Sequence, residues 1–92
     1  MKPTELELIV LRTIISDTYP YTLSPDAIGR PVRIENVLRD NLDLVLAGVV
    51  PEVLYAVLDS LNDKHWVNLD LDVNGNSVCC ISQDGYNSCM RL

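Results

Sequence analysis

The pattern of apolar and polar residues predicts three helices in the first two thirds of the chain. Apolar side chains recur at helical spacing over residues 4–16, 33–46 and 51–64. Thr4 stands where its side chain can cap the first of these helices. Pro51 stands at the first position of the third helix, where a missing N–H is tolerated. Residues 47–50 form the turn between the second and third helices.

The segment between the first two helices is predicted to be a loop. Pro20 and Pro25 remove backbone donors there and bias the residues before them toward extended conformations. A short strand is expected at residues 21–23. A single helical turn is expected to start at residues 24–26 and to end at Gly29.

From residue 67 onward the period of the pattern changes from helical to two. Four apolar residues alternate with three polar ones, in the order Val67, Asn68, Leu69, Asp70, Leu71, Asp72 and Val73. Such alternation is typical of a half-buried strand. Asn74-Gly75, which follows, is a strong hairpin signal because a two-residue type I′ turn needs positive φ at both central positions.

A two-residue turn at this point fixes the register of the predicted hairpin. Leu71 would lie opposite Val78, and Leu69 opposite Cys80. Cys80 would then be a core residue, while Cys79 would be exposed beside Asp70. After the second strand, Ser82 can cap a last short helix that runs through Tyr86 to Met90.

The order of these elements resembles that of winged helix-turn-helix transcriptional regulators. Residues 51–67 resemble the third helix of such regulators and its passage into the first wing strand. Ile81-Ser82-Gln83-Asp84-Gly85-Tyr86 is similar to their usual strand end followed by Thr-x-x-Gly. His65 stands where such regulators usually have glycine. We therefore expect a mainly α fold of three helices, a two-stranded β-hairpin as the wing, and a short C-terminal helix.

Length and composition indicate one globular domain spanning residues 1–92. Apolar residues make up 48% of the chain and charged residues 22%, which is too apolar for disorder. No apolar run approaches the roughly 20 residues of a membrane span, and Glu5 and Glu7 interrupt the N-terminal apolar stretch, unlike a signal peptide. Three cysteines fit no secreted disulfide framework. We expect a cytoplasmic protein.

The net charge of −6 is unevenly distributed along the chain. Residues 1–39 contain five acids and five bases, whereas residues 40–92 contain eight acids and only two bases, Lys64 and Arg91. All the excess negative charge therefore lies in the part that holds the third helix and the hairpin. This asymmetry decides between the two kinds of partner that the resemblance allows.

The resemblance implies that the helix at 51–64 is a recognition helix and that residues 73–77 are the wing tip. The residues expected to face solvent on the helix and the first strand are Glu52, Tyr55, Asp59, Asn62, Asp63, Asp70 and Asp72. This set contains no base, so it opposes the phosphate contacts that give DNA binding most of its non-specific affinity. It would complement a basic surface on another protein. We expect a non-catalytic regulatory or adaptor module that binds protein.

The alternative is a DNA-binding transcriptional regulator that acts as a homodimer. Its phosphate contacts would come from Arg30, Arg33 and Arg39, and the residues nearest the bases would be Tyr55, Asn62 and Asn76. Two simpler interpretations stand beside these hypotheses. The arginines can be an ordinary solvated helix face, and the acids can serve only to keep a small domain soluble.

The first helix has an apolar surface much wider than a surface helix needs. Its apolar side chains cover roughly 260° of the circumference, against about 100° for a helix packed on one side. The helix is therefore either central in the core or shared with a second subunit. In the second case the dimer contact would include Leu8, Leu11 and Ile15.

Neither a metal site nor a catalytic site is expected. Asp70, Asp72, Asn74 and Gly75 match the start of an EF-hand calcium loop, but Ile81 stands where its bidentate Glu belongs, and a strand with a turn explains the same residues. The cysteines lack C-x-x-C spacing for zinc, and His65 has no nucleophile in a recognisable motif. We therefore predict no metal, no cofactor and no enzymatic activity.

Overall fold

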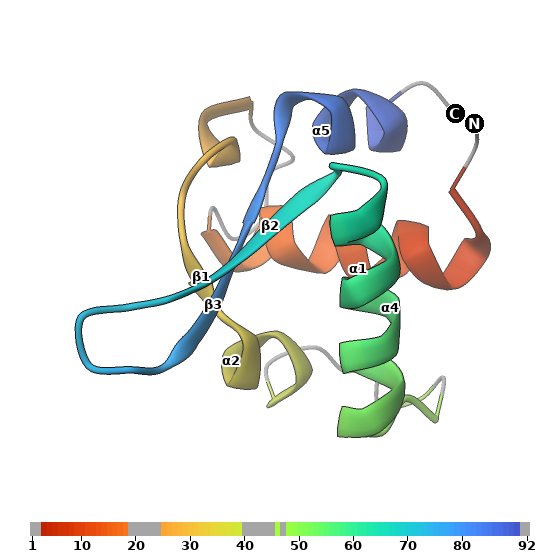
Figure 1. The fold of residues 1–92 in the computed structure, drawn as a ribbon. Helices are drawn as coiled ribbons and strands as arrows, with labels where there is room; N and C mark the ends of the chain where they lie inside the picture. Colours follow the sequence, from red (N-terminus) through yellow and green to blue (C-terminus); the bar gives the residue numbers. More distant parts are fainter. Residues whose placement is uncertain (1–2, 19–24, 40–45, 47, 91–92) are drawn as a thin grey trace.

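The computed structural model describes residues 3–18, 25–39, 46 and 48–90 of the chain. Along the chain lie α1 (Glu5–Thr18), the short 3-10 helix η1 (Pro25–Ala27), β1 (Val32–Arg33), α2 (Ile34–Arg39), α4 (Pro51–Asp63), β2 (Val67–Leu71), β3 (Ser77–Ile81) and α5 (Gln83–Met90). Figure 1 shows the β2–β3 hairpin projecting away from α4, with α1 crossing behind that helix. None of the helices within these ranges is long and apolar enough to cross a membrane.

The predicted helices are confirmed where the structure describes them. The first and third lie within two residues of their expected bounds, and η1 is followed by Gly29 with φ 80°. The second helix is described only as far as Arg39; most of its predicted second half, like the strand expected at residues 21–23, lies outside the described residues. Ser82 caps α5 as predicted, because the amide of Gly85 donates to its hydroxyl at 3.0 Å.

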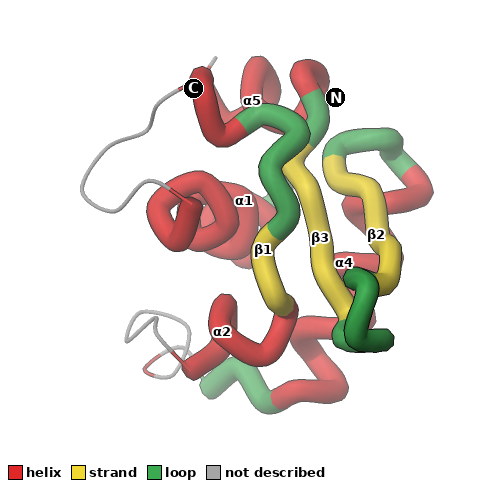
Figure 2. The backbone as a smooth tube through the Cα atoms, turned by 90° about the vertical axis from the view of Figure 1, so that its left-hand side faces the viewer, coloured by secondary structure: helices red, strands yellow, loops and turns green. Residues whose placement is uncertain are grey.

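The predicted β-hairpin is present as β2 and β3, but the described residues form a sheet of three strands, so the expectation of only two strands was wrong. β1 pairs antiparallel with β3, Val32 opposite Cys79 and Arg33 opposite Val78, so that the strand order is β1-β3-β2. Figure 2 shows β3 between its two neighbours. Two residues are too few for an alternating pattern, so this strand leaves no periodic signal in the sequence.

Helix α1 is the central element of the core. It contacts α2, α4, α5 and the sheet, which explains why its apolar surface is so wide. Leu11 and Ile15 are completely buried among residues of their own chain, and Leu8 packs against that core while half-buried. Leu11 and Ile15 are therefore unavailable to a second subunit. The dimer contact predicted at these two positions is corrected to an intrachain core.

Helix α4 buries less of its apolar surface than the sequence suggests. Leu54, Leu58 and Leu61 are buried against the core, whereas the apolar side chains of Val53 and Ala56 are exposed. The fully buried side of α4 is therefore made of its leucines alone. An apolar strip remains on the surface of this helix, next to the N-terminal turn of α1.

The turn of the hairpin has three residues, not the predicted two. The amide of Asp72 donates to the carbonyl of Asn76 at 2.9 Å, and the amide of Gly75 donates to the carbonyl of Asp72 at 3.0 Å. Gly75 has φ 81°, whereas Asn74 does not have positive φ, so a type I′ turn is excluded. The carboxylate of Asp72 accepts hydrogen bonds from the amides of Asn74 and Asn76, at 2.8 and 2.9 Å, and these bonds stabilise the longer turn.

The longer turn shifts the register by one residue and exchanges the two adjacent cysteines. Leu69 lies opposite Cys79, and Leu71 opposite Ser77. Because side chains alternate across a strand, Cys79 is buried and Cys80 is half-buried, the reverse of the prediction. Burial, together with the charge of Asp70, raises the pKa of the Cys80 thiol. The more accessible of these two thiols is therefore poorly reactive.

His65 ends α4 in a left-handed conformation, with φ 62°. Its amide donates to the carbonyl of Asn62 at 3.0 Å, and the amide of Trp66 donates to the carbonyl of Leu61 at 2.9 Å. These are the two hydrogen bonds of a Schellman motif, which favours glycine at the left-handed position. Among the described residues, His65 is the only non-glycine residue with positive φ.

We expect His65→Gly to stabilise the protein by about 1 kcal/mol, because glycine adopts this conformation without the steric penalty of a Cβ atom. Thermal unfolding should show a midpoint about 5 °C higher. His65→Ala is the matched control, since alanine removes the imidazole and retains the Cβ. An equal gain in both variants would contradict the assignment to backbone conformation.

Candidate functional site

The outer face of α4 is the main element of the candidate site. The helix begins at Pro51, and its three buried leucines fix which side faces the core. As predicted, the residues exposed on the other side include Glu52, Tyr55, Asp59, Asn62 and Asp63. We call these five residues the outer face of α4. It contains no base, and Tyr55, which is 46% exposed, is its one large aromatic side chain.

The hairpin adds fewer free carboxylates than the sequence suggests. Asp70 is exposed, but the carboxylate of Asp72 is engaged by the turn. The hydrogen bond from the amide of Asn76, above all, lowers the pKa of Asp72 below its ordinary 3.8, against the effect of desolvation, and the charge of Arg33 also lowers it. The side-chain amide of Asn76 donates to the same carboxylate at 3.3 Å. The main role of Asp72 and Asn76 in this structure is therefore to stabilise the turn of the hairpin.

Arg33, one of the predicted phosphate contacts, lies beside the hairpin, a position that the sequence did not indicate. Arg33 and Asp70 both lie opposite Val78, on the two sides of β3, because β1 joins the sheet. Arg33 also forms an ion pair with Glu35, with 3.5 Å between Nη1 and Oε1. The positive charge of Arg33 therefore lies near two acidic residues, Glu35 and Asp70. At the end of the hairpin Leu71 and Val73 are exposed, so the tip is apolar as well as acidic.

The other two arginines of the predicted DNA contact come from different elements. Arg30 follows η1, and its Nε donates to the carbonyl of Asp26 at 3.1 Å. Arg39 ends α2, and its Nη2 donates to the Oδ1 of Asn36 at 2.8 Å. Both side chains are exposed, but each is held by its own segment. The structure therefore does not arrange the three arginines along one helix face.

A hollow of about 300 Å³ between α2 and α4 brings residues of both predicted sites together. Its lining consists of Ile34, Glu35, Arg39, Pro51, Leu54 and Tyr55. Tyr55 belongs to the predicted protein surface and to the alternative DNA surface, and Arg39 only to the latter. The sequence could not predict that Arg39 and Tyr55 line one hollow, because their proximity depends on how α2 and α4 pack.

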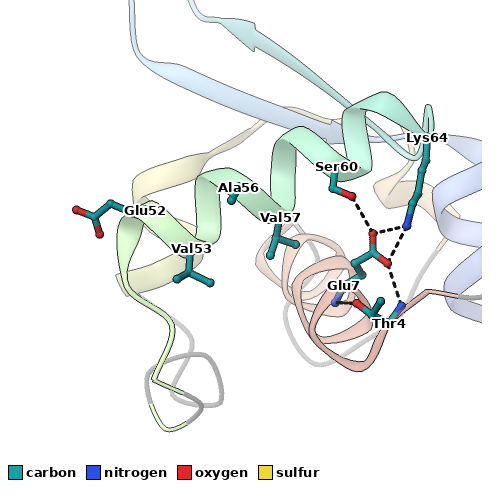
Figure 3. A pocket seen from close by; sticks show the side chains of 8 residues that line it. All are labelled: Thr4, Glu7, Glu52, Val53, Ala56, Val57, Ser60 and Lys64. Carbon is teal, nitrogen blue, oxygen red and sulfur yellow. Dashed lines mark hydrogen bonds and ion pairs between the residues drawn. The ribbon is translucent and has the colours of Figure 1, made fainter.

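A second site, which the sequence did not indicate, surrounds Glu7. The carboxylate of Glu7 is buried and accepts two hydrogen bonds from Nζ of Lys64, at 2.7 and 2.9 Å. Glu7 and Thr4 also form a capping box, with the amide of Thr4 donating to Oε1 at 2.9 Å and the amide of Glu7 donating to the hydroxyl of Thr4 at 3.1 Å. Figure 3 shows these groups converging, with Ser60 close by. The capping box was within reach of sequence analysis; the partner 57 residues away was not.

The electrostatics of this second site favour the charged form of Glu7. Burial by itself would raise the pKa, but the bonds from Lys64 and Thr4 together bring the pKa of Glu7 below its ordinary 4.5. Nζ of Lys64 also lies 5.0 Å from the centre of the Trp66 ring, within the range of a cation–π contact. The pair therefore ties the beginning of α1 to the end of α4.

Potential metal ligands do not gather in the described part of the chain. No three His, Cys, Asp or Glu side chains there lie close enough to hold one ion. Asp70 accepts a hydrogen bond from the amide of Leu71 at 2.8 Å, so both acids of the calcium-like pattern bond to main-chain amides. The main chain of His65 forms the C-terminal end of α4, where its amide donates to the carbonyl of Asn62.

Comparison of the chain with known protein families, with curated proteins and with solved structures finds no significant match. The winged-helix resemblance of residues 51–86 therefore remains a prediction. The properties that bear on function are those of the surface itself, namely the outer face of α4, the hairpin, the hollow between α2 and α4, and the apolar strip of α4 next to α1.

Proposed function

We propose that the protein is a non-catalytic winged-helix module, a regulator or adaptor that binds another protein through the outer face of α4 and the hairpin. The order of the described elements supports the fold assignment, since α2 and α4 are followed along the chain by the β2–β3 hairpin. The choice of a protein partner is supported by the outer face of α4, which has no base, and by the acidic hairpin with its apolar tip.

The observation that carries the proposal is the exposure of Tyr55 among carboxylates. Large aromatic side chains are the usual anchors of protein interfaces, and carboxylates around them select a basic partner surface. Phosphates would meet Asp59 and Asp63 on the same helix without a compensating base. The outer face of α4 therefore suits contact with a protein carrying lysines or arginines.

DNA binding is the second candidate, and the hollow between α2 and α4 is the observation in its favour. Arg39 and Tyr55 both line it, so a phosphate contact and an aromatic side chain lie together. Arg33 beside the hairpin would add a second phosphate contact. In this function the acids of α4 act against binding and the arginines alone provide the affinity.

We expect partner recovery from the native host to depend on the outer face of α4. Tyr55→Ala and Asp59→Lys should each reduce the recovered partner about tenfold, because they remove the anchor or reverse its surrounding charge. Asp84→Lys is the matched control, since it makes the same charge change at an exposed position on α5. Equal loss in Asp59→Lys and Asp84→Lys would show that only net charge matters, against a defined interface.

The same preparations separate the two candidate functions. Titration with random duplex DNA at low salt should show no binding that falls steeply as salt rises. Salt-dependent binding that is lost in both Arg33→Ala and Arg39→Ala would replace the protein-binding proposal with the DNA-binding one.

A further inference from the structure

A groove of about 450 Å³ lies between the first turn of α1 and the side of α4 next to the outer face. Val53, Ala56 and Val57 form its apolar floor, and the ion pair of Glu7 and Lys64 closes one end. Figure 3 shows Val53 and Val57 on the same side of α4, facing the groove. Val53 remains 38% exposed, so the floor of the groove is open to solvent.

The floor has the spacing of a helix–helix contact. From Val53 to Val57, Ser60 and Lys64 the steps are four, three and four residues, the repeat that keeps one stripe of a helix facing a neighbouring helix. The leucines of α4 form a similar stripe that is buried against the core. Helix α4 thus carries two such stripes. The leucine stripe is buried, whereas the second is only half-covered by its own chain, with Val57 packed partly against the core and Val53 exposed. Ala56 and Ser60 are small, which permits the close approach of another helix.

The rim of the groove is acidic. At about 100° per residue, Glu52, Asp59 and Asp63 follow Ala56 around α4 on the solvent side of the stripe. Of these acids, Glu52 itself lines the groove. Lys64 stands at the end of the groove, but its charge is balanced by Glu7 at 2.7 Å. The field around the apolar floor is therefore negative.

We propose that this groove binds one amphipathic helix of a partner protein, with aliphatic residues at the same heptad spacing and with lysines or arginines on its flanks. The aliphatic residues would cover the floor, and the basic flanks would meet the acidic rim. A second copy of α4 is disfavoured because it would bring the same acids against this rim. The inference rests on the proposed protein-binding function and names the partner's chemistry and place.

A designed peptide of 13 residues, the length of α4, tests the groove directly. It carries leucines at heptad positions and lysines on both flanks, and its control has the same composition with the leucines scattered. Fluorescence anisotropy of the labelled peptide measures affinity, and the emission of Trp66, the only tryptophan, reports on the Lys64 end of the groove. The heptad peptide should bind the protein at least about tenfold more tightly than its control.

Variants on two sides of α4 locate the bound peptide. Val53→Ser and Ala56→Gln change no charge and affect only exposed positions, and each should weaken binding about tenfold. Asn62→Gln, on the outer face of the same helix, should leave it unchanged. Melting curves of all variants should coincide with that of the natural protein within a few degrees, which keeps a loss of binding from being mistaken for a loss of folding.

Three outcomes would overturn the inference. Equal binding of the scattered peptide, unaffected by Val53→Ser, would show charge attraction without a groove. Loss of binding in Tyr55→Ala with Val53→Ser unaffected would place the helix on the outer face of α4, which retains the proposed function and removes only the groove. A concentration-dependent dimer that Val53→Ser abolishes would identify a second copy as the occupant.

Discussion

Gly85→Ala is expected to destabilise the protein by about 3 kcal/mol, although the same change inside a helix ordinarily stabilises it. A Cβ atom at this buried position of α5 would lie 2.9 Å from the carbonyl carbon of Trp66, closer still to its oxygen, and 3.1 Å from Cγ1 of Ile81. The carbonyl oxygen of Trp66 cannot move away freely, because it accepts hydrogen bonds from the amide and the hydroxyl of Ser82, at 2.9 and 3.0 Å.

Thermal or denaturant unfolding measures this effect, and the melting midpoint should fall by on the order of 15 °C. Ser88→Ala, one turn further along α5, is the control. Its hydroxyl only bonds back to the carbonyl of Asp84 within the helix, so its removal should change the midpoint little. If Gly85→Ala were as stable as Ser88→Ala, the close packing of α5 on the end of α4 would be wrong.

The second large effect is expected from Lys64→Met, which leaves the buried carboxylate of Glu7 without its charged partner. Breaking a buried ion pair by removing one member destabilises by several kcal/mol, and because Lys64 is one quarter exposed we expect about 2 kcal/mol at neutral pH. The double variant with Glu7→Gln should recover part of the loss, since glutamine retains the capping box without a charge.

The difference between the natural protein and Lys64→Met should depend on pH. The lowered pKa of Glu7 in the folded protein means that its contribution is present above the ordinary value of 4.5 and is lost as the pH falls through the folded pKa. The natural protein should therefore lose stability below about pH 4.5, and the two curves should converge. A constant difference from pH 7 to pH 3 would show that Lys64 acts through packing on Trp66 alone.

Local patterns were sufficient to predict most of the elements. Residues 51–63 combine a helical period with a proline at the first position, and the sheet period begins at Val67 as the sequence indicates. The register failed for a local reason that was also visible, because the Asp72 side chain can stabilise a three-residue turn that competes with the Asn74-Gly75 signal. The sequence thus favoured both a two-residue turn at Asn74-Gly75 and a three-residue turn held by Asp72. The one-residue difference in register between them decides which side chains of β3 face the core.

The candidate site was predictable only where it belongs to a single helix. Exposure of Tyr55 and Asp59 follows from the buried stripe of leucines on the same helix. The ion pair of Glu7 and Lys64, and both hollows, join residues from different helices, and nothing in the spacing along the chain specifies how those helices approach. The exposure of Val53 has the same origin, because it depends on how far the first turn of α1 reaches across α4.

The central position of α1 has a consequence for the order of events during synthesis. Helix α1 is made before the elements that cover it, namely α4, the sheet and α5, the last of which ends at Met90. Until those elements have been made, Leu11, Ile14 and Ile15 have little apolar surface to pack against. The growing chain should therefore stay unfolded and open to chaperones until α5 has been made, and these elements should then fold in one cooperative step.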